Sequence, residues 1–342
     1  LGTKAETRVS LDIHGNIVNR YDYPQVYTSW QYLFSTLRKQ ISDKNYYMGD
    51  DCIEITQSNE KALAIFENGK KQESDLIIVA NGIKSDLRSF VDENAYPQYA
   101  GYVGWRGVVQ EEEISQKSLD VLSKYFIIVL PFNQQICVYP IAGEGKNPFK
   151  IGQRRINWIW YKPVPSNSLK EILFGKSGKQ YEDGIPPDEI RVEVVNELFK
   201  EAEKKLPPQI VELVKKTKQP LIQPIFDLES LKMKNGRIVT IGDAAFTARP
   251  HVGMGVTKAA MDAFSMSEAL GSKNCLKTLN IWEKNRLKEG KFIVNRSREL
   301  GKYLSLPQKK SNLIMPDVQD VLKDTAISLH DISDYEIYER LQ

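Results

Sequence analysis

The stretch 237–263 contains the residues best suited to hold a phosphorylated cofactor. An apolar run ends at Gly242-Asp243, and the loop that follows leads through Gly253 and Gly255 into a helix of small residues. A strand that delivers an acid, followed by glycines at a helix start, is typical of such a site because the free amides and positive end of the helix attract phosphate.

A second loop contains residues of a similar kind. The apolar, β-branched run 76–80 predicts a strand in the buried middle of a sheet, and the segment 81–88 follows it with the sequence Asn-Gly-Ile-Lys-Ser-Asp-Leu-Arg. Gly82 permits a tight turn there, and Ser85 can cap a short helix. Taken alone, this segment is compatible with a plain strand-to-helix connection. Because 237–263 is also present, we favour two loops that converge on one cofactor.

The N-terminal part predicts a hairpin and a helix. Residues 12–17 are typical of a hairpin turn. Apolar side chains recur at helical spacing over 27–41, with Thr28 and Ser29 as candidate N-caps. Arg38 lies outside that apolar stripe. A solvated arginine is the more usual interpretation of such a position, and a contact with a cofactor phosphate is the sharper hypothesis.

The region 99–161 has the texture of an antiparallel sheet. Its short aromatic and β-branched runs are separated by turn residues, and in the last run alternate residues share a face, so Trp158 and Trp160 point the same way. Together with Trp105 and Tyr139 they could cover a flat apolar ligand. For any one of these residues, packing against helices is at least as good an interpretation.

Composition excludes several classes of protein. With 342 residues, 41% of them hydrophobic and 27% charged, the chain is ordinary for a globular protein and long enough for two domains. The 47 basic and 44 acidic residues leave a net charge of +3, which is too balanced to indicate nucleic-acid binding. Three widely spaced cysteines favour free thiols in a reducing compartment over a metal site or a disulfide. No run reaches the roughly 18 apolar residues that span a bilayer, so we expect a cytoplasmic location.

Together these motifs resemble a known family. The segments 81–88 and 242–255 look like the two downstream motifs of the FAD-dependent aromatic hydroxylases, the class A flavoprotein monooxygenases. The order also matches over roughly the whole chain: a helix with an arginine, the first motif, an antiparallel substrate sheet, the second motif and terminal helices. Within the family, the segments 105–107, 249–251 and 257–260 are most similar to the 2,6-dihydroxypyridine 3-monooxygenase branch.

The resemblance implies an α/β (α+β) fold, in which an antiparallel-sheet substrate domain is inserted into a FAD-binding Rossmann-like domain and helices follow at the C-terminus. It also implies FAD- and NAD(P)H-dependent hydroxylation of a small aromatic or N-heteroaromatic, hydroxypyridine-like substrate through a C4a-hydroperoxyflavin. The expected parts are 1–95 for FAD binding, 96–224 for the substrate sheet with helices, 225–275 for the return to the FAD-binding domain, and 276–342 for the terminal helices and arm.

The same resemblance assigns residues to the cofactors. Asp243 would bind the ribityl or ribose hydroxyls of FAD, and Arg38 would reach its diphosphate. Asp86 and Arg88 would contact both FAD and NAD(P)H. The pyrophosphate and the isoalloxazine would be bordered by Gly253, Met254, Gly255 and Val256.

Catalytic and substrate residues are assigned in the same way. Pro250 and His251 would line the flavin face at which the substrate docks. His251 is the candidate base that deprotonates a hydroxylated ring, although a histidine packed in its loop is about as good an interpretation. The expected substrate contacts come from Trp105, Tyr139, Trp158, Trp160 and His251.

Four departures from the family pattern affect these expectations. Asn81 replaces the usual aspartate of the first motif, Thr257 stands where asparagine is common, and Ser29 stands where many members have arginine. The family also opens with a strand, a Gly-x-Gly-x-x-Gly turn and a helix, and no such stretch occurs in the sequence. We therefore expect a chain truncated at its N-terminus, with weakened FAD binding in the absence of that unit.

Two other functions stay open. A flavin oxidoreductase that does not hydroxylate would oxidise NAD(P)H without inserting oxygen into a product. An inactive truncated relic that acts as an interaction protein is favoured by Asn81 and by the missing N-terminal unit. The expected partners are a small aromatic substrate and molecular oxygen, without nucleic acid, a metal ion or a membrane span, and a homodimer is considered as the oligomeric state.

Overall fold

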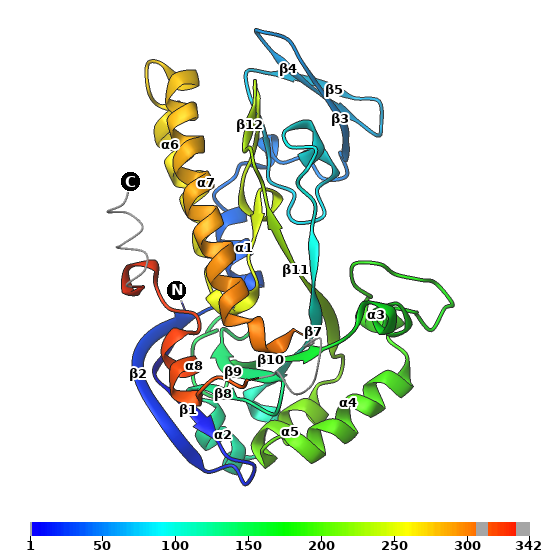
Figure 1. Ribbon diagram of the computed structural model, residues 1–342, viewed down its shortest axis with the longest axis vertical. Helices are drawn as coiled ribbons and strands as arrows, with labels where there is room; N and C mark the ends of the chain where they lie inside the picture. The colour runs from blue at the N-terminus through cyan, green and yellow to red at the C-terminus, as the bar shows by residue number, and fades with distance from the viewer. Residues whose placement is uncertain (1, 306–313, 333–342) are drawn as a thin grey trace. The chain divides into compact units, whose positions relative to one another are not determined.

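The computed structural model describes residues 2–305 and 314–332, and the chain divides into two compact units, which we treat separately (Figure 1). Unit 1 combines Leu1–Ser42, Ala100–Ile225 and Tyr303–Lys323, and unit 2 combines Asp43–Tyr99, Phe226–Lys302 and Asp324–Gln342. Each unit is thus assembled from segments far apart in the sequence. Residues 1–42, which we grouped with the FAD-binding part, cluster here with the antiparallel sheet.

Unit 1 is built on a large sheet with the strand order β11-β7-β10-β9-β8-β1-β2. The pairs from β7 to β8 that the register defines are antiparallel, as expected for the region 99–161, whereas β1 and β8 run parallel. The strands are β1 (Thr3–Leu11), β2 (Ile17–Tyr27), β7 (Gln98–Gln110), β8 (Phe126–Val129), β9 (Gln135–Ile141), β10 (Arg155–Pro163) and β11 (Leu221–Glu229). The α-helices are α1 (Trp30–Arg38), α2 (Gln116–Leu122), α3 (Ser166–Ile172), α4 (Val192–Lys205), α5 (Pro208–Lys216) and α8 (Val318–Asp324), and the 3-10 helices are η3 (Glu111–Glu113), η4 (Pro187–Glu189) and η7 (Lys302–Leu304).

Local hydrogen bonds explain the first elements of unit 1. Between β1 and β2, Asp12 Oδ1 accepts from the backbone amides of His14 at 2.9 Å and Asn16 at 2.8 Å, which confirms the predicted hairpin turn. Helix α1 begins after Ser29, whose Oγ accepts from the amide of Tyr32 at 3.1 Å. None of the residues of α1 is buried.

One face of the sheet carries the tryptophans. The register pairs Trp160 on β10 with Trp105 on β7, so these two side chains lie on the same face as Trp158. Both β10 tryptophans are fully buried. Their indole N–H groups donate to Thr217 Oγ1 at 2.8 Å, at the C-cap of α5, and to Gln134 Oε1 at 3.0 Å. This face is therefore packed core.

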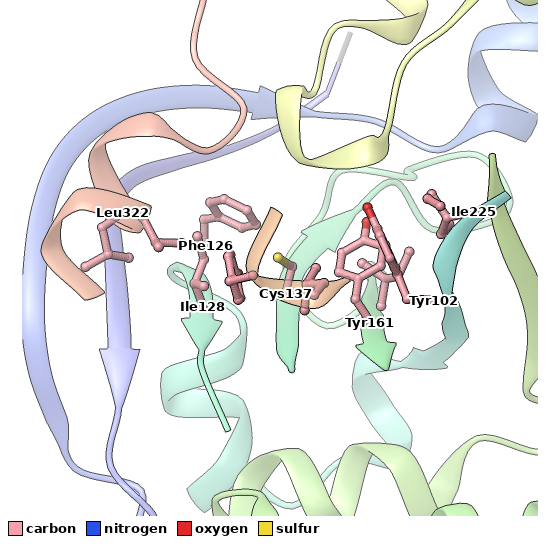
Figure 2. Packing of buried hydrophobic residues seen from close by; sticks show 12 residues of the cluster. Tyr102, Phe126, Ile128, Cys137, Tyr161, Ile225 and Leu322 are labelled. Atoms are coloured by element: carbon pink, nitrogen blue, oxygen red, sulfur yellow. The ribbon is translucent and has the colours of Figure 1, made fainter. Parts of the chain in front are cut away.

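The opposite face of the sheet carries a second cluster. Ile159 and Tyr161 on β10 alternate with the tryptophans and pack with residues of η7 and α8. Figure 2 shows the cluster from close by, with Leu322 of α8 at one end, Ile225 at the other, and Tyr102 and Tyr161 adjacent to each other between them. The buried members include Tyr102, Phe126, Ile128, Cys137, Ile159, Tyr161, Ile225, Tyr303, Leu304, Val321 and Leu322.

Unit 2 contains two small sheets, with the orders β12-β13-β6 and β3-β4-β5, and a short pairing of β14 with the end of β11. The strands are β3 (Cys52–Gln57), β4 (Ala62–Phe66), β5 (Lys71–Ser74), β6 (Ile77–Val79), β12 (Lys234–Asn235), β13 (Ile238–Thr240) and β14 (Phe246–Thr247). The helices are η1 (Asp43–Asn45), η2 (Asp86–Phe90), η5 (Gly242–Ala244), η6 (Pro250–Val252), α6 (Gly255–Leu270), α7 (Cys275–Leu300) and η9 (Leu329–Asp331).

The position of β6 differs from the sequence-based expectation. Among the described strands β6 lies at the end of its sheet, and Ile78 is 43% exposed, so the prediction of a strand in the middle of a sheet was wrong. Its neighbour Val79 packs in a core cluster with Ile55 and Ile238. A run of three apolar residues is therefore buried on one side only, and composition alone could not distinguish this case from burial on both sides.

Helices α6 and α7 pack against each other in unit 2 (Figure 1). Met266 and Ala269 of α6 meet Leu279 and Trp282 of α7 in one buried cluster. Neither these two helices nor any other helix within residues 2–305 and 314–332 is long and apolar enough to cross a membrane.

Candidate cofactor site

Two parallel strands bring the two predicted motifs together in unit 2. Strands β6 and β13 pair in register from Ile77 and Ile238 onward, and the amide of Ile241 donates to the Val79 carbonyl at 3.1 Å. The first motif therefore leaves the carboxyl end of β6, and the second leaves the carboxyl end of β13. In open α/β sheets this edge is where ligands bind.

Arg88 links the two motifs directly. Its Nε donates to the carbonyl of Ala244 at 2.8 Å, and a second guanidinium nitrogen donates to the carbonyl of Ile83. The side chain is 4% exposed, and burial lowers the pKa of its guanidinium. Asp86, in contrast, is exposed in the first turn of η2. Of these two predicted cofactor residues, Arg88 thus supports the loops and Asp86 faces outward.

The turn at Gly242 is held on both sides by helix α6. Gly242 has a φ of +60°, a left-handed conformation that favours glycine. Its amide donates to Asp262 Oδ2 at 2.9 Å, and its carbonyl accepts from Lys258 Nζ at 2.9 Å. The same Nζ lies 3.0 Å from Asp262 Oδ2. The backbone that carries Asp243 is therefore fixed by a buried ion pair.

A second pair of charges completes this network. Arg286 of α7 donates from Nε to Asp262 Oδ1 at 2.7 Å, and its two terminal nitrogens bind the Glu289 carboxylate at 2.6 and 2.8 Å. The four side chains Lys258, Asp262, Arg286 and Glu289 are between 1% and 15% exposed, and their formal charges sum to zero. Such a network is stable only because each buried charge has a partner.

Sequence interpretation missed this network, although a signal for it existed. Lys258 and Asp262 are four residues apart on a helix that is otherwise rich in small and apolar residues. Oppositely charged residues at this spacing lie on the same helix face. Their burial follows from tertiary packing and cannot be derived from their spacing.

Asp243 is exposed at the end of the turn. Desolvation by the surrounding atoms raises the pKa of its carboxyl, Lys258 acts in the opposite direction, and Asp262 adds to the rise. The carboxylate of Asp243 is thus exposed to solvent and also near the buried ammonium group of Lys258. An accessible carboxylate can accept hydrogen bonds from hydroxyl groups of a ligand.

The loop before α6 is closed by a distant segment of unit 2. Gly253 has a φ of +66°, and a Cβ added to it would lie 2.5 Å from the Cβ of Ala326. The amide of Ala326 also donates to the carbonyl of His251 at 2.8 Å. Arg249 adds an ion pair, with its Nε 2.7 Å from Asp227 Oδ2. This loop is therefore rigidly built.

His251 is a buried residue in this loop. It is 2% exposed, and burial, with a smaller effect from Arg249, lowers the pKa of its imidazole to about 3. The imidazole is therefore neutral at physiological pH. A base that acts near pH 7 works best with a pKa close to that value. The setting of His251 thus favours the interpretation as a packed loop histidine. Pro250 beside it is partly exposed at the start of η6.

The start of α6 is open to a ligand. Met254 is buried at 3% exposure, whereas Val256 is 61% exposed. A Cβ added to Gly255 would meet no atom within 4 Å, so space adjoins the first turn of this helix of 16 residues. The first amides of a helix and the positive end of its dipole suit an anionic group.

The remaining predicted site residues lie in unit 1. Arg38 is partly exposed in the last turn of α1, and its Nη1 donates to the carbonyl of Ile41 at 2.9 Å. Tyr139 pairs with Asn157 on β10 and so lies on the face opposite the tryptophans. The residues that we expected to cover one ligand are thus divided between two faces of the sheet: Trp105, Trp158 and Trp160 on one, and Tyr139 on the other.

Comparison with known proteins agrees with this architecture. A family model described as FAD binding domain-like matches residues 99–227. The chain is 26% identical to the 2,6-dihydroxypyridine 3-monooxygenase of Paenarthrobacter nicotinovorans over 282 residues, which cover 81% of this chain and 69% of that protein. Other curated relatives align over 31% to 60% of their own length.

Solved structures share the fold. The chain superposes on 2,6-dihydroxypyridine-3-hydroxylase from Arthrobacter nicotinovorans with a TM-score of 0.83 and 23% identity, over 93% of this chain and 83% of that one. For HpxO of Klebsiella pneumoniae complexed with FAD and uric acid, the TM-score is 0.73 at 17% identity, over 99% of this chain and 80% of that one. The fold is therefore that of the FAD-dependent aromatic hydroxylases, with their Rossmann-like architecture, and the recognition made from the motifs is confirmed. Among these enzymes, the 2,6-dihydroxypyridine monooxygenases are similar to this chain in both sequence and structure.

Proposed function

We propose that the protein is a FAD- and NAD(P)H-dependent monooxygenase that hydroxylates a small aromatic or N-heteroaromatic substrate of the hydroxypyridine kind. The observation that carries this proposal is the junction of the two motifs: Arg88 ties the loop after β6 to Ala244 in the loop after β13. The names of the relatives, which describe monooxygenases and hydroxylases of aromatic and heteroaromatic compounds, support the same reaction class.

The residues of unit 2 fit FAD. Asp243 is accessible and would accept hydrogen bonds from ribityl or ribose hydroxyls. The open space at Gly255 would admit the pyrophosphate close to the helix amides, and the backbone from Gly253 to Val256 would border the flavin ring. Asp86 is exposed at the end of the first motif, and Arg88 supports the second motif through its hydrogen bond to the Ala244 carbonyl. We propose Arg38 for the diphosphate and Asp86 with Arg88 for NAD(P)H as well.

When bound, FAD supplies the redox chemistry that delivers one oxygen atom from molecular oxygen to the substrate, with NAD(P)H as the reductant. The chain itself contributes position. Lys258 and Asp262 hold the turn that presents Asp243. Pro250 would line the flavin side of this loop. The backbone carbonyl of His251 accepts a hydrogen bond from the amide of Ala326 and so holds the loop, and its imidazole, with a lowered pKa, would be a weak base.

We further propose that the sheet of unit 1 contributes the substrate side. Tyr139 is a better candidate for substrate contact than Trp158 or Trp160, because both of these are fully buried with satisfied indole groups. Trp105 is 4% exposed and belongs to the same packed face.

Cofactor loading and substrate-dependent turnover test the proposal. The purified protein is titrated with FAD while its visible spectrum is recorded, and oxidation of NADH and of NADPH is then followed with and without 2,6-dihydroxypyridine. We expect bound flavin, and NAD(P)H oxidation that the substrate stimulates with little release of hydrogen peroxide. A protein that takes up no FAD would contradict the proposal, and peroxide release without a hydroxylated product would favour a non-hydroxylating oxidoreductase.

Location and assembly are part of the same proposal. We propose that the protein works in a reducing compartment such as the cytoplasm, in keeping with the free thiols of Cys52, Cys137 and Cys275. A homodimer is proposed as its oligomeric state. Analytical ultracentrifugation tests this, and a sedimentation coefficient that corresponds to a 39.1 kDa particle at all concentrations would contradict it.

A further inference from the structure

The face of the unit 1 sheet that carries Tyr139 contains polar groups without a partner. The buried atoms Arg106 Nε, Gln135 Oε1 and Tyr303 Oη form no hydrogen bond with any of the residues that the structure describes. The register places Arg106 opposite Ile159, and Gln135 opposite Tyr161, on this same face. Tyr303 belongs to η7, which packs against this face. Buried polar groups without a partner are uncommon in a native protein and point to a ligand.

Arg106 is the charged member of this set. Neither a hydrogen bond nor an ion pair of its guanidinium occurs within residues 2–305 and 314–332, although the residue is more than half buried. By contrast, Arg155 on the same face donates to the Ala142 carbonyl at 3.0 Å and to Glu144 Oε1 at 2.9 Å. An unpaired, partly desolvated cation is costly unless an anion completes it.

The neighbours of Arg106 are tyrosines that cannot neutralise it. Arg106 lies close enough to Tyr139 and Tyr161 to lower the pKa of both, yet burial is the larger effect and raises them. Both hydroxyls therefore stay protonated at neutral pH. Tyr161 also packs edge to face with Tyr102, with the ring centroids 6.1 Å apart (Figure 2). Arg106 thus places a cation beside the partly exposed ring of Tyr139.

We propose that Arg106 binds the negatively charged group of a planar aromatic ligand on this sheet face. The ring would lie against Tyr139, the partly exposed tyrosine beside Arg106, and the guanidinium would pair with a ring oxyanion or a carboxylate. This inference rests on the proposed function, in which unit 1 contributes the substrate side, and it specifies the substrate as an aromatic anion. Gln135 Oε1 is an acceptor and would receive a hydrogen bond from a ring N–H or hydroxyl.

A matched pair of ligands tests the charge preference. Benzoate and benzamide have the same shape and differ in charge, and isothermal titration of the FAD-supplemented protein without NAD(P)H measures both affinities in the absence of turnover. We expect the wild type to bind benzoate at least tenfold more tightly than benzamide, and Arg106→Met to abolish that preference. Arg106→Lys, which keeps the charge, should restore part of it.

Arg155→Met is the control, because it removes a paired arginine from the same face and should leave the preference unchanged. An unchanged preference in Arg106→Met, equal affinities in the wild type, or no binding of either ligand would overturn the inference. Failure of the proposed function gives a different result. A protein without FAD uptake or NAD(P)H oxidation still yields a benzoate-to-benzamide ratio, because the titration requires no turnover.

Discussion

Replacing Lys258 by methionine tests how the turn that carries Asp243 is held. The Lys258 ammonium binds the Gly242 carbonyl at 2.9 Å and Asp262 at 3.0 Å, and 1% of the side chain is exposed. Each charge-assisted hydrogen bond of this kind contributes about 1.5–3 kcal/mol. Asp262 keeps Arg286 and the Gly242 amide as partners. Because the two bonds share one ammonium group, their contributions do not add in full, and the expected loss is about 2–3 kcal/mol.

Calorimetry and FAD titration measure the two consequences separately. A loss of that size lowers Tm by roughly 4–12 °C in a unit of about 150–250 residues. Because the released turn presents Asp243, we also expect FAD affinity to fall about tenfold, or ~1.4 kcal/mol. Arg154→Met is the matched control, since it breaks a buried pair in unit 1 in which Arg154 Nη2 lies 2.7 Å from Glu111 Oε1. It should lower Tm and leave FAD affinity unchanged. A Lys258→Met protein with wild-type Tm and FAD affinity would refute the reasoning.

Three further predictions follow from the same loops. The pKa of His251, about 3 when folded against 6.5 when unfolded, means that the unfolded chain takes up a proton first. The contribution of His251 to the free energy of unfolding should be present above about pH 6.5 and should fall by about 2 kcal/mol by pH 5. Urea unfolding at a series of pH values measures this dependence, which should be weaker in His251→Asn. Gly253→Ala should lower the free energy of unfolding by about 2 kcal/mol or more, because Gly253 has a φ of +66° and an added Cβ would meet Ala326. Gly255→Ala should keep Tm and weaken FAD binding, because its Cβ would enter the open space. Equal effects of the two variants on Tm would count against a ligand at Gly255. On acidification, Asp243 should become protonated at a higher pH than an ordinary aspartate, because its pKa is raised. FAD affinity should fall over the same pH range in the wild type and should not depend on pH there in Asp243→Asn.

The sequence predicted those features that depend on local pattern. Acid and glycine after an apolar strand identified the loop at Gly242, and the cap at Ser29 and the turn at 12–17 follow from side chains a few residues away. Because such signals are contained in one stretch of chain, they need no knowledge of the fold. The sheet of unit 1 was predictable for the same reason.

Features that depend on distant segments were not predictable. The burial of His251 requires the loop at Ala326, which lies 75 positions further along the chain. That Tyr139 and Trp158 lie on opposite faces of the sheet depends on the strand register. Alternation within β10 shows which of its own residues share a face, but not which residues of β9 lie on that face. The same holds for Arg88, whose partner Ala244 belongs to the other motif.

Incorporation of labelled oxygen tests the central claim most directly. The FAD-loaded protein is supplied with NAD(P)H, 2,6-dihydroxypyridine and ¹⁸O₂, and the product is analysed by mass spectrometry. A monooxygenase places one ¹⁸O atom in the hydroxylated ring, so the product mass should rise by one labelled oxygen relative to the substrate. Consumption of NAD(P)H by the flavin-loaded protein with no ¹⁸O in any product would contradict the account.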